Sequence, residues 1–259
     1  KDTNISQKIQ AVKKILLELQ GYDRGAFAKK YLLPVQEFCE MSVELANLKF
    51  VQNTKTLRLA NLKIGQYWLK QLNMEKLPLP TSNFTVKSSA DGRKARPYIV
   101  SVNETVGITT TGLSLPKIVT FNISDGTTQK ALMKGSNDDL RQDAIMEQVF
   151  QQVNKVLQND KVLRNLDLGI RTYKVVPLGP KAGIIEFVAN STSLHQILSK
   201  LHTNDKVTFD QARKGIKAVQ TKSNEERLKA YLKITNEIKP QLRNFFFDSF
   251  PDPLDWFEA

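Results

Sequence analysis

The spacing of apolar residues divides the chain into helical and extended stretches. Across residues 5–72 apolar side chains recur every three or four positions, as Val12 and Leu16 do, and this spacing places them on one side of a helix. The run Gly21 to Gly25 interrupts the pattern, and Pro34 favours the first turn of the next helix or a kink in it. We therefore predict stacked antiparallel helices in this first part of the chain.

The pattern changes after residue 76. Pro78 and Pro80 exclude a continuing helix, and the chain then reads as short apolar runs separated by turn residues. Residues 117–123 and 127–133 are two such runs joined through Ser-Asp-Gly. That combination predicts a β-hairpin.

A helix and two further strands are expected next. Apolar residues recur at helical spacing from Leu140 to Leu157, which predicts a helix over residues 139–159. Residues 172–178 and 184–188 are short apolar runs on either side of a Gly-Pro-Lys-Ala-Gly turn. The order of strands, helix and strands predicts an antiparallel sheet with one helix packed against it.

Helices return in the last part of the chain. We predict a short one around residues 193–201 and a long one from about 224 to 246. The fold class is therefore α+β. The changes in pattern divide the chain into residues 1–76, 77–187 and 188–259.

Composition narrows the class of protein. Over 259 residues, 41% hydrophobic and 25% charged residues are typical of a globular domain, and no apolar run approaches the roughly 18–20 residues that cross a bilayer. The start, Lys1 to Ser6, lacks both methionine and the apolar stretch of a signal peptide, so we expect a segment of a longer chain.

Cys39 is the only cysteine, which excludes disulfides within the chain and favours a reducing, intracellular compartment. With only His195 and His202 beside it, the sequence does not support a structural zinc site.

The net charge of +12 permits contact with nucleic acid or another polyanion. The lysines, however, are spread along the predicted helices and are not clustered with aromatic residues. We interpret most of this charge as a solvated surface and leave direct DNA binding open.

The candidate chemistry is concentrated where a strand meets a helix, in the run Lys134-Gly-Ser-Asn-Asp-Asp-Leu-Arg-Gln-Asp143. A lysine at a strand end that points past a helix start is suited to holding phosphate. A simpler interpretation also fits: Asp138 or Asp139 caps the helix and Lys134 is a solvated strand end.

Two common nucleotide-binding signatures are absent, because the chain contains neither G-x-x-x-x-G-K-[ST] nor G-x-G-x-x-G. A hydroxyl-rich loop from Thr109 to Leu115 does lie between two predicted strands, where backbone N–H groups and hydroxyls can approach phosphate. Asp167-Leu-Gly169 is similar to the magnesium-binding element of kinases, but it precedes any adenine-binding hinge. We therefore predict that it is a turn at the entrance to a strand.

Several segments together resemble the amino-terminal lobe of the phosphatidylinositol 3-kinase-related protein kinases, in particular the ATM-type checkpoint kinases and their fungal telomere-maintenance relatives. The segments that carry the resemblance are Gly112 to Lys117, Lys134-Gly, Asp138 to Asp143, Met146 to Phe150, Thr172 to Pro177, Ile185 to Phe187 and Phe250 to Glu258. The resemblance covers nearly the whole chain. It implies that residues 1–76 are the end of the helical FAT region, 77–187 the kinase N-lobe, and 188–259 the hinge exit and the first helices of an incomplete C-lobe.

The resemblance also implies an ATP site. Lys134 would contact the phosphates and Asp138 would orient it, with Asp139 as the alternative because this stretch is one residue longer than in the relatives. Glu186, Phe187 and Val188 match the hinge that holds adenine, Tyr173 the back of the pocket and Thr192 its mouth. The loop over the phosphates comprises Thr109, Thr110, Thr111, Gly112, Leu113, Ser114, Leu115 and Pro116.

The catalytic loop and the ligands of Mg²⁺ or Mn²⁺ do not occur in the sequence and are expected after Ala259, so the segment alone is predicted to be inactive. For the parent protein the resemblance implies a serine/threonine protein kinase of DNA-damage and telomere-maintenance signalling. Its expected partners are protein substrates, DNA-break or telomere-end sensor proteins and a second copy of itself. Its expected location is the nucleus, including chromosomes and telomeres. The alternatives are a phosphatidylinositol lipid kinase and a catalytically inactive scaffold.

Overall fold

The computed structural model describes residues 2–50, 54–66, 68–69, 76–82, 97–109, 114–135 and 139–252. The chain forms two compact units. The first comprises Lys1–Lys155 and Ile170–Phe187, and the second comprises Val156–Gly169 and Val188–Ala259. The sheet and the helix that covers it belong to the first unit. The division into residues 1–76, 77–187 and 188–259, which the sequence pattern indicated, stays a prediction.

The chain begins with the helices α1 (Asp2–Gly21) and α2 (Leu33–Asn47). A short 3₁₀ turn, η1 (Tyr22–Gly25), and a π-helical turn, η2 (Ala28–Leu32), connect them. The predicted interruption is confirmed, because Asp23, Arg24 and Gly25 all have positive φ, which ends an α-helix. Pro34 lies in the first turn of α2, where its missing N–H costs nothing.

The prediction of helices up to residue 72 was wrong in one segment. Thr56–Arg58 forms the strand β1, which pairs antiparallel with β3 (Thr105–Ile108). A short turn, η3 (Leu59–Asn61), follows it. A three-residue strand is too short to show a period of two, and it is held by a partner more than 40 residues away in the chain.

Seven strands of the described residues form one antiparallel sheet, in the order β1-β3-β4-β5-β7-β6, with β2 paired to β4. The remaining strands are β2 (Ile99–Val102), β4 (Lys117–Ile123), β5 (Thr128–Gly135), β6 (Val175–Gly179) and β7 (Ala182–Glu186). The predicted hairpin is confirmed as β4 and β5. Its turn is closed by Asp125, which accepts from the backbone N–H of Thr127, and by Gly126 at φ 85°.

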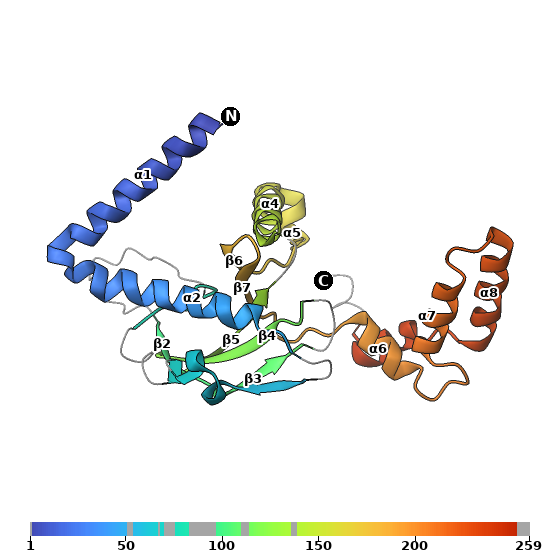
Figure 1. Cartoon of the computed structure of the whole chain (residues 1–259). Helices are drawn as coiled ribbons and strands as arrows, with labels where there is room; N and C mark the ends of the chain where they lie inside the picture. Colours follow the sequence, from blue (N-terminus) through green and yellow to red (C-terminus); the bar gives the residue numbers. More distant parts are fainter. Residues whose placement is uncertain are drawn as a thin grey trace. The chain divides into compact units, whose positions relative to one another are not determined.

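Helix α2 covers one face of this sheet (Figure 1). Phe38 and Leu45 of α2 are buried there against Phe121 and Met133 of the central strands. The ring of Phe38 also stacks on Trp68, with 5.4 Å between the ring centroids. This face, which we call the α2 face, contains the hydrophobic core of the first unit.

The predicted helix after the hairpin is confirmed as α4 (Leu140–Asn159), followed by the short helix α5 (Lys161–Asn165). It is not, however, the helix that covers the sheet. Along α4 only Leu140 and Glu147 are buried, whereas Met146, Val149 and other apolar side chains are exposed. Leu140 Cδ1 lies 3.2 Å from the position that a Cβ on Gly183 of β7 would occupy, so α4 approaches the sheet at its first turn.

The second unit contains helices α6 (Leu194–Leu201), α7 (Phe209–Ala218), α8 (Asn224–Glu237) and α9 (Leu242–Ser249). The first three begin with capping boxes, formed by Ser193 with Gln196, Thr208 with Gln211, and Ser223 with Glu226. The predicted helix over 193–201 is confirmed, and α7 was not predicted.

The single helix predicted from 224 to 246 was wrong. Ile238 is extended, and Pro240 lies in the break between α8 and α9, where it cannot continue a helix. In the described part of the chain, no helix combines the length and the apolar composition needed to cross a membrane.

Candidate nucleotide-binding site

Lys134 and Asp143 form the centre of the candidate site. Lys134 is the last residue but one of β5, and its Nζ lies 3.4 Å from Oδ2 of Asp143 in the first turn of α4. Both side chains are only partly covered, at 27% and 46% exposed, so the ammonium remains accessible to a ligand. A carboxylate that forms an ion pair with a lysine favours one position of the lysine ammonium.

Asp143 was not predicted as the partner of Lys134. The predicted partner, Asp138, lies outside the described residues. The alternative, Asp139, is occupied elsewhere: its carboxylate accepts from the backbone N–H and from the guanidinium of Arg141, at 3.0 and 2.6–2.9 Å. These hydrogen bonds hold the pKa of Asp139 below its ordinary value. Asp143 could have been predicted from the sequence, because a helix that begins at Leu140 places Asp143 in its first turn.

The side chain of Lys134 points to the face of the sheet opposite α2. Successive strand residues face opposite sides, so Lys134 shares its side with Leu132 and, through the ladder, with Ile118 and Ile185. We call this side the Lys134 face. Its three apolar residues lie next to one another across β4, β5 and β7, and form an apolar surface beside the charged pair. These three residues were not among the predicted site residues.

Tyr173 lies close to the same acidic residues. Its backbone N–H donates to Oε2 of Glu147, at 3.0 Å, and the Glu147 side chain is buried. Burial raises the pKa of the Tyr173 phenol above its ordinary value, and the negative charges of Glu147 and Asp143 raise it further. The structure thus brings the predicted Tyr173 together with the residue that holds Lys134.

The predicted hinge begins at the end of β7. The backbone N–H of Glu186 donates to the carbonyl of Lys174, at 2.8 Å, and that of Phe187 to the carbonyl of Lys130, at 3.4 Å. The ammonium of Lys130 also lies 5.5 Å from the centroid of the Phe187 ring. The backbone N–H groups of Glu186 and Phe187, the two predicted hinge residues of the first unit, therefore already have acceptors within this unit.

The other two predicted pocket residues belong to the second unit. The carbonyl of Val188 accepts from the hydroxyl of Ser191, at 2.8 Å, and the hydroxyl of Thr192 donates to Gln196, at 3.0 Å. Among the described residues, none accepts a hydrogen bond from the backbone N–H of Val188.

Only the ends of the predicted phosphate loop are described. Thr110 to Leu113 lie outside the described residues, whereas Thr109, Ser114, Leu115 and Pro116 lie within them. The backbone N–H of Thr109 donates to the carbonyl of Pro116, at 3.0 Å, which closes the loop at its base between β3 and β4. Leu115 has a φ of 39°, a conformation that a side chain of this size rarely adopts.

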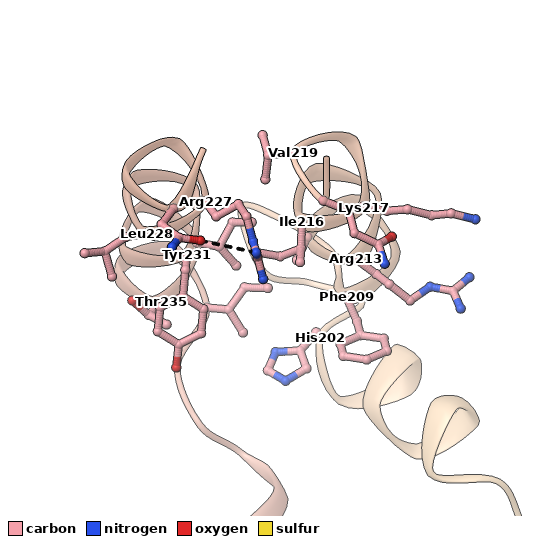
Figure 2. Close-up of a pocket in the computed structure, with 15 residues that line it drawn as sticks. His202, Phe209, Arg213, Ile216, Lys217, Val219, Arg227, Leu228, Tyr231 and Thr235 are labelled. Atoms are coloured by element: carbon pink, nitrogen blue, oxygen red, sulfur yellow. Dashed lines mark hydrogen bonds between the residues drawn. The ribbon is translucent and has the colours of Figure 1, made fainter. Parts of the chain in front are cut away.

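The second unit contains a separate, largely apolar pocket between α7 and α8 (Figure 2). Phe209 and Ile216 of α7 and Tyr231 of α8 contribute to its lining, together with His202. Nδ1 of His202 lies 2.7 Å from Oδ2 of Asp205, which also accepts from the amide of Gln241. No sequence motif predicted this pocket.

Asp167 occupies a turn, as predicted, but this turn ends α5 and does not lie at the entrance to a strand, because β6 begins only at Val175. The φ of Asp167 is 48°, and its backbone N–H donates to the carbonyl of Arg164, at 3.1 Å. This is a helix end of the left-handed type.

Comparison with known proteins identifies the family. Residues 129–259, which include Lys134, Asp143, Tyr173 and the predicted hinge, match the family described as phosphatidylinositol 3- and 4-kinase. The chain belongs to this family. Over all 259 residues it is 99% identical to the serine/threonine-protein kinase TEL1 of Saccharomyces cerevisiae and 56% identical to that of Eremothecium gossypii. The chain spans 9% of the length of each of these relatives.

Solved structures agree with this assignment to the kinase family. The chain is similar to a structure described as a Tel1 kinase butterfly symmetric dimer, with a TM-score of 0.79 and 99% identity over 99% of this chain and 11% of that one. It is also similar to the FAT and kinase domain of CtTel1, with a TM-score of 0.82 and 35% identity over 96% of this chain and 18% of that one. The resemblance to ATM-type kinases and the α+β fold class are confirmed. The lipid kinase alternative is not favoured, because these relatives are named as protein kinases.

Proposed function

We propose that this chain supplies the ATP-binding part of a serine/threonine protein kinase, which transfers the γ-phosphate of ATP to protein hydroxyls. The observation that carries the proposal is the pair Lys134 and Asp143 at the edge of the Lys134 face. A held ammonium beside an apolar surface matches the two ends of a nucleotide, the charged phosphates and the flat base.

The contacts of these residues indicate how the phosphates and the base of ATP would be held. Lys134 would bind phosphate oxygens, while Asp143 keeps its ammonium in position. The base would lie on Ile118, Leu132 and Ile185. Because the predicted hinge N–H groups of the first unit already have acceptors within that unit, the N–H of Val188 is the hinge donor that we propose for adenine.

A divalent ion, Mg²⁺ or Mn²⁺, would neutralise charge on the phosphates during transfer. Within the described residues no group of three or more His, Cys, Asp or Glu is placed to hold such an ion. Asp143 already pairs with Lys134. In the kinases that the chain resembles, the catalytic base and the metal ligands lie in motifs that do not occur in this sequence, and we propose that a part of the complete protein outside this segment supplies them.

The wider role that we propose rests on the resemblance to the ATM-type checkpoint kinases. We propose that the complete protein phosphorylates protein substrates in DNA-damage and telomere-maintenance signalling in the nucleus, at chromosomes and telomeres. DNA-break or telomere-end sensor proteins would recruit it. A homodimer is supported by the solved Tel1 structures described as dimers.

The test is Lys134→Met in the complete protein. This change removes the ammonium and keeps an apolar stem of similar length, so we expect kcat/KM to fall by about 100-fold or more while the protein stays folded. Asp167→Ala is the matched control, because Asp167 lies in a turn, and we expect it to retain activity.

Activity would be measured on a protein substrate and on phosphatidylinositol vesicles, and folding by thermal melting. Near-normal turnover of Lys134→Met on a protein substrate would contradict the proposal. Phosphorylation of the lipid alone would favour the lipid kinase alternative.

A further inference from the structure

A second lysine, Lys117, is buried in the first unit. It is the first residue of β4, only 1% of its surface is exposed, and burial lowers the pKa of its ammonium. It pairs across the ladder with Met133 and lies in phase with the core residues Val119 and Phe121, so it points to the α2 face. No carboxylate of the described residues forms an ion pair with it.

The partner of Lys117 is the end of helix α2. Its Nζ donates to the backbone carbonyl of Ala46, at 2.7 Å, and lies 5.5 Å from the centroid of the Phe50 ring. Carbonyls in the last turn of a helix lack partners within the helix and lie at the negative end of its dipole. Since Ala46 is itself buried, an unpaired carbonyl there would be costly, and a cation is the donor best suited to it.

The same helix end also touches β5. A Cβ on Gly135 would stand 2.6 Å from the carbonyl oxygen of Ala46 and 2.8 Å from Oδ1 of Asn47. No side chain fits at that spacing without displacing backbone. The Ala46 carbonyl is thus held between Lys117 of β4 and the backbone of β5.

Gly135 directly follows Lys134 in β5. The end of α2 therefore rests on one side of the strand while the side chain of Lys134 leaves from the other. The end of α2 is therefore in direct contact with the backbone next to Lys134.

We propose that Lys117 is a positioning residue that fastens the end of α2 to the sheet and thereby sets the position of Lys134. This inference rests on the proposed role of Lys134 in holding phosphate. It links the helical segment before the sheet to the affinity for nucleotide.

The test is Lys117→Met in the complete protein, with Lys55→Met as the matched control, because Lys55 is exposed beside β1. We expect the KM for ATP to rise about fivefold in Lys117→Met, with the KM for the protein substrate unchanged. A purely structural role would lower the amount of active enzyme, and so the apparent kcat, without moving either KM. Lys55→Met should change neither constant.

A second variant reaches the same contact without changing charge. Gly135→Ala places a methyl group against the Ala46 carbonyl, and we expect it also to raise the KM for ATP. Hydrogen exchange at the backbone of Met133 to Gly135 should be faster in both variants than in the wild type. This variant decides the matter if Lys117→Met does not fold.

The outcomes separate the two proposals. If Lys117→Met and Gly135→Ala leave the KM for ATP unchanged while Lys134→Met abolishes activity, the positioning role is overturned and the proposed function stands. If Lys134→Met retains near-normal activity, both are overturned.

Discussion

Helices α2 and α4 are both amphipathic, yet only α2 buries its apolar side against the sheet. In α2, Phe38 and Leu45 are buried against the sheet. In α4, Ile145 and Val149 are 58% and 47% exposed, although the hydrophobic pattern is as clear. In the second turn of α4 the buried side chain is that of Glu147, an acidic residue.

The difference shows what a hydrophobic period does and does not indicate. It identifies a side of a helix that avoids water, but it does not identify the surface that covers that side. In this chain α2 supplies the core, whereas α4 supplies the acidic residues Asp143 and Glu147 to Lys134 and Tyr173. The helix with less burial is therefore the one that builds the candidate site.

The largest expected difference in stability comes from truncating one apolar residue in each helix. Leu45→Ala in α2 and Ile145→Ala in α4 both remove three carbon atoms. We expect Leu45→Ala to lower the free energy of unfolding of the 259-residue chain by about 2–5 kcal/mol, because it leaves a cavity in the core. Ile145→Ala should change it by less than about 0.5 kcal/mol.

Urea unfolding followed by the fluorescence of Trp68, in a Trp256→Phe background, measures both values at the buried core of the first unit. Equal losses in the two variants would contradict the distinction between the helices.

Substitution of Glu147, the buried acidic residue of α4, is expected to lower the free energy of unfolding by a smaller amount. Glu147→Leu keeps the size of the side chain but leaves the backbone N–H of Tyr173 without its acceptor. We expect a loss of about 1–3 kcal/mol in the free energy of unfolding, measured in the same way. Glu147→Gln retains a carbonyl acceptor and should lose less than about 1 kcal/mol. If both variants were as stable as the wild type, Glu147 would not anchor the segment that carries Tyr173.

Elements with a local signal were predictable from sequence. The hairpin of β4 and β5, the bounds of α4 and the short helix α6 follow from period, turn residues and caps. The strand β1 was not predictable, because three residues show no period and the strand depends on its partner β3. Pro240 marks the break between α8 and α9 in the sequence. Apolar residues recur at helical spacing on both sides of this proline, however, and a single helix was therefore predicted.

The candidate site was predictable in part. Lys134 was identified from its place between a strand and a helix, but the choice of its partner depended on where the helix starts. Lys117 illustrates a signal that was available: it occupies an inward position of the alternating run that contains Val119 and Phe121. A charged residue in such a position predicts a buried partner, but the partner itself, the Ala46 carbonyl, follows only from the packing of α2.

Nucleotide binding at Lys134 is measured most directly by covalent labelling with an ATP analogue that carries a sulfonyl fluoride in place of the phosphates. In the complete protein, peptide mass spectrometry should find the label on Lys134, since its ammonium lies at the phosphate end of the proposed site. An excess of ATP should prevent that labelling. Labelling of other lysines only, or labelling of Lys134 that ATP does not prevent, would contradict the claim that Lys134 holds the nucleotide phosphates.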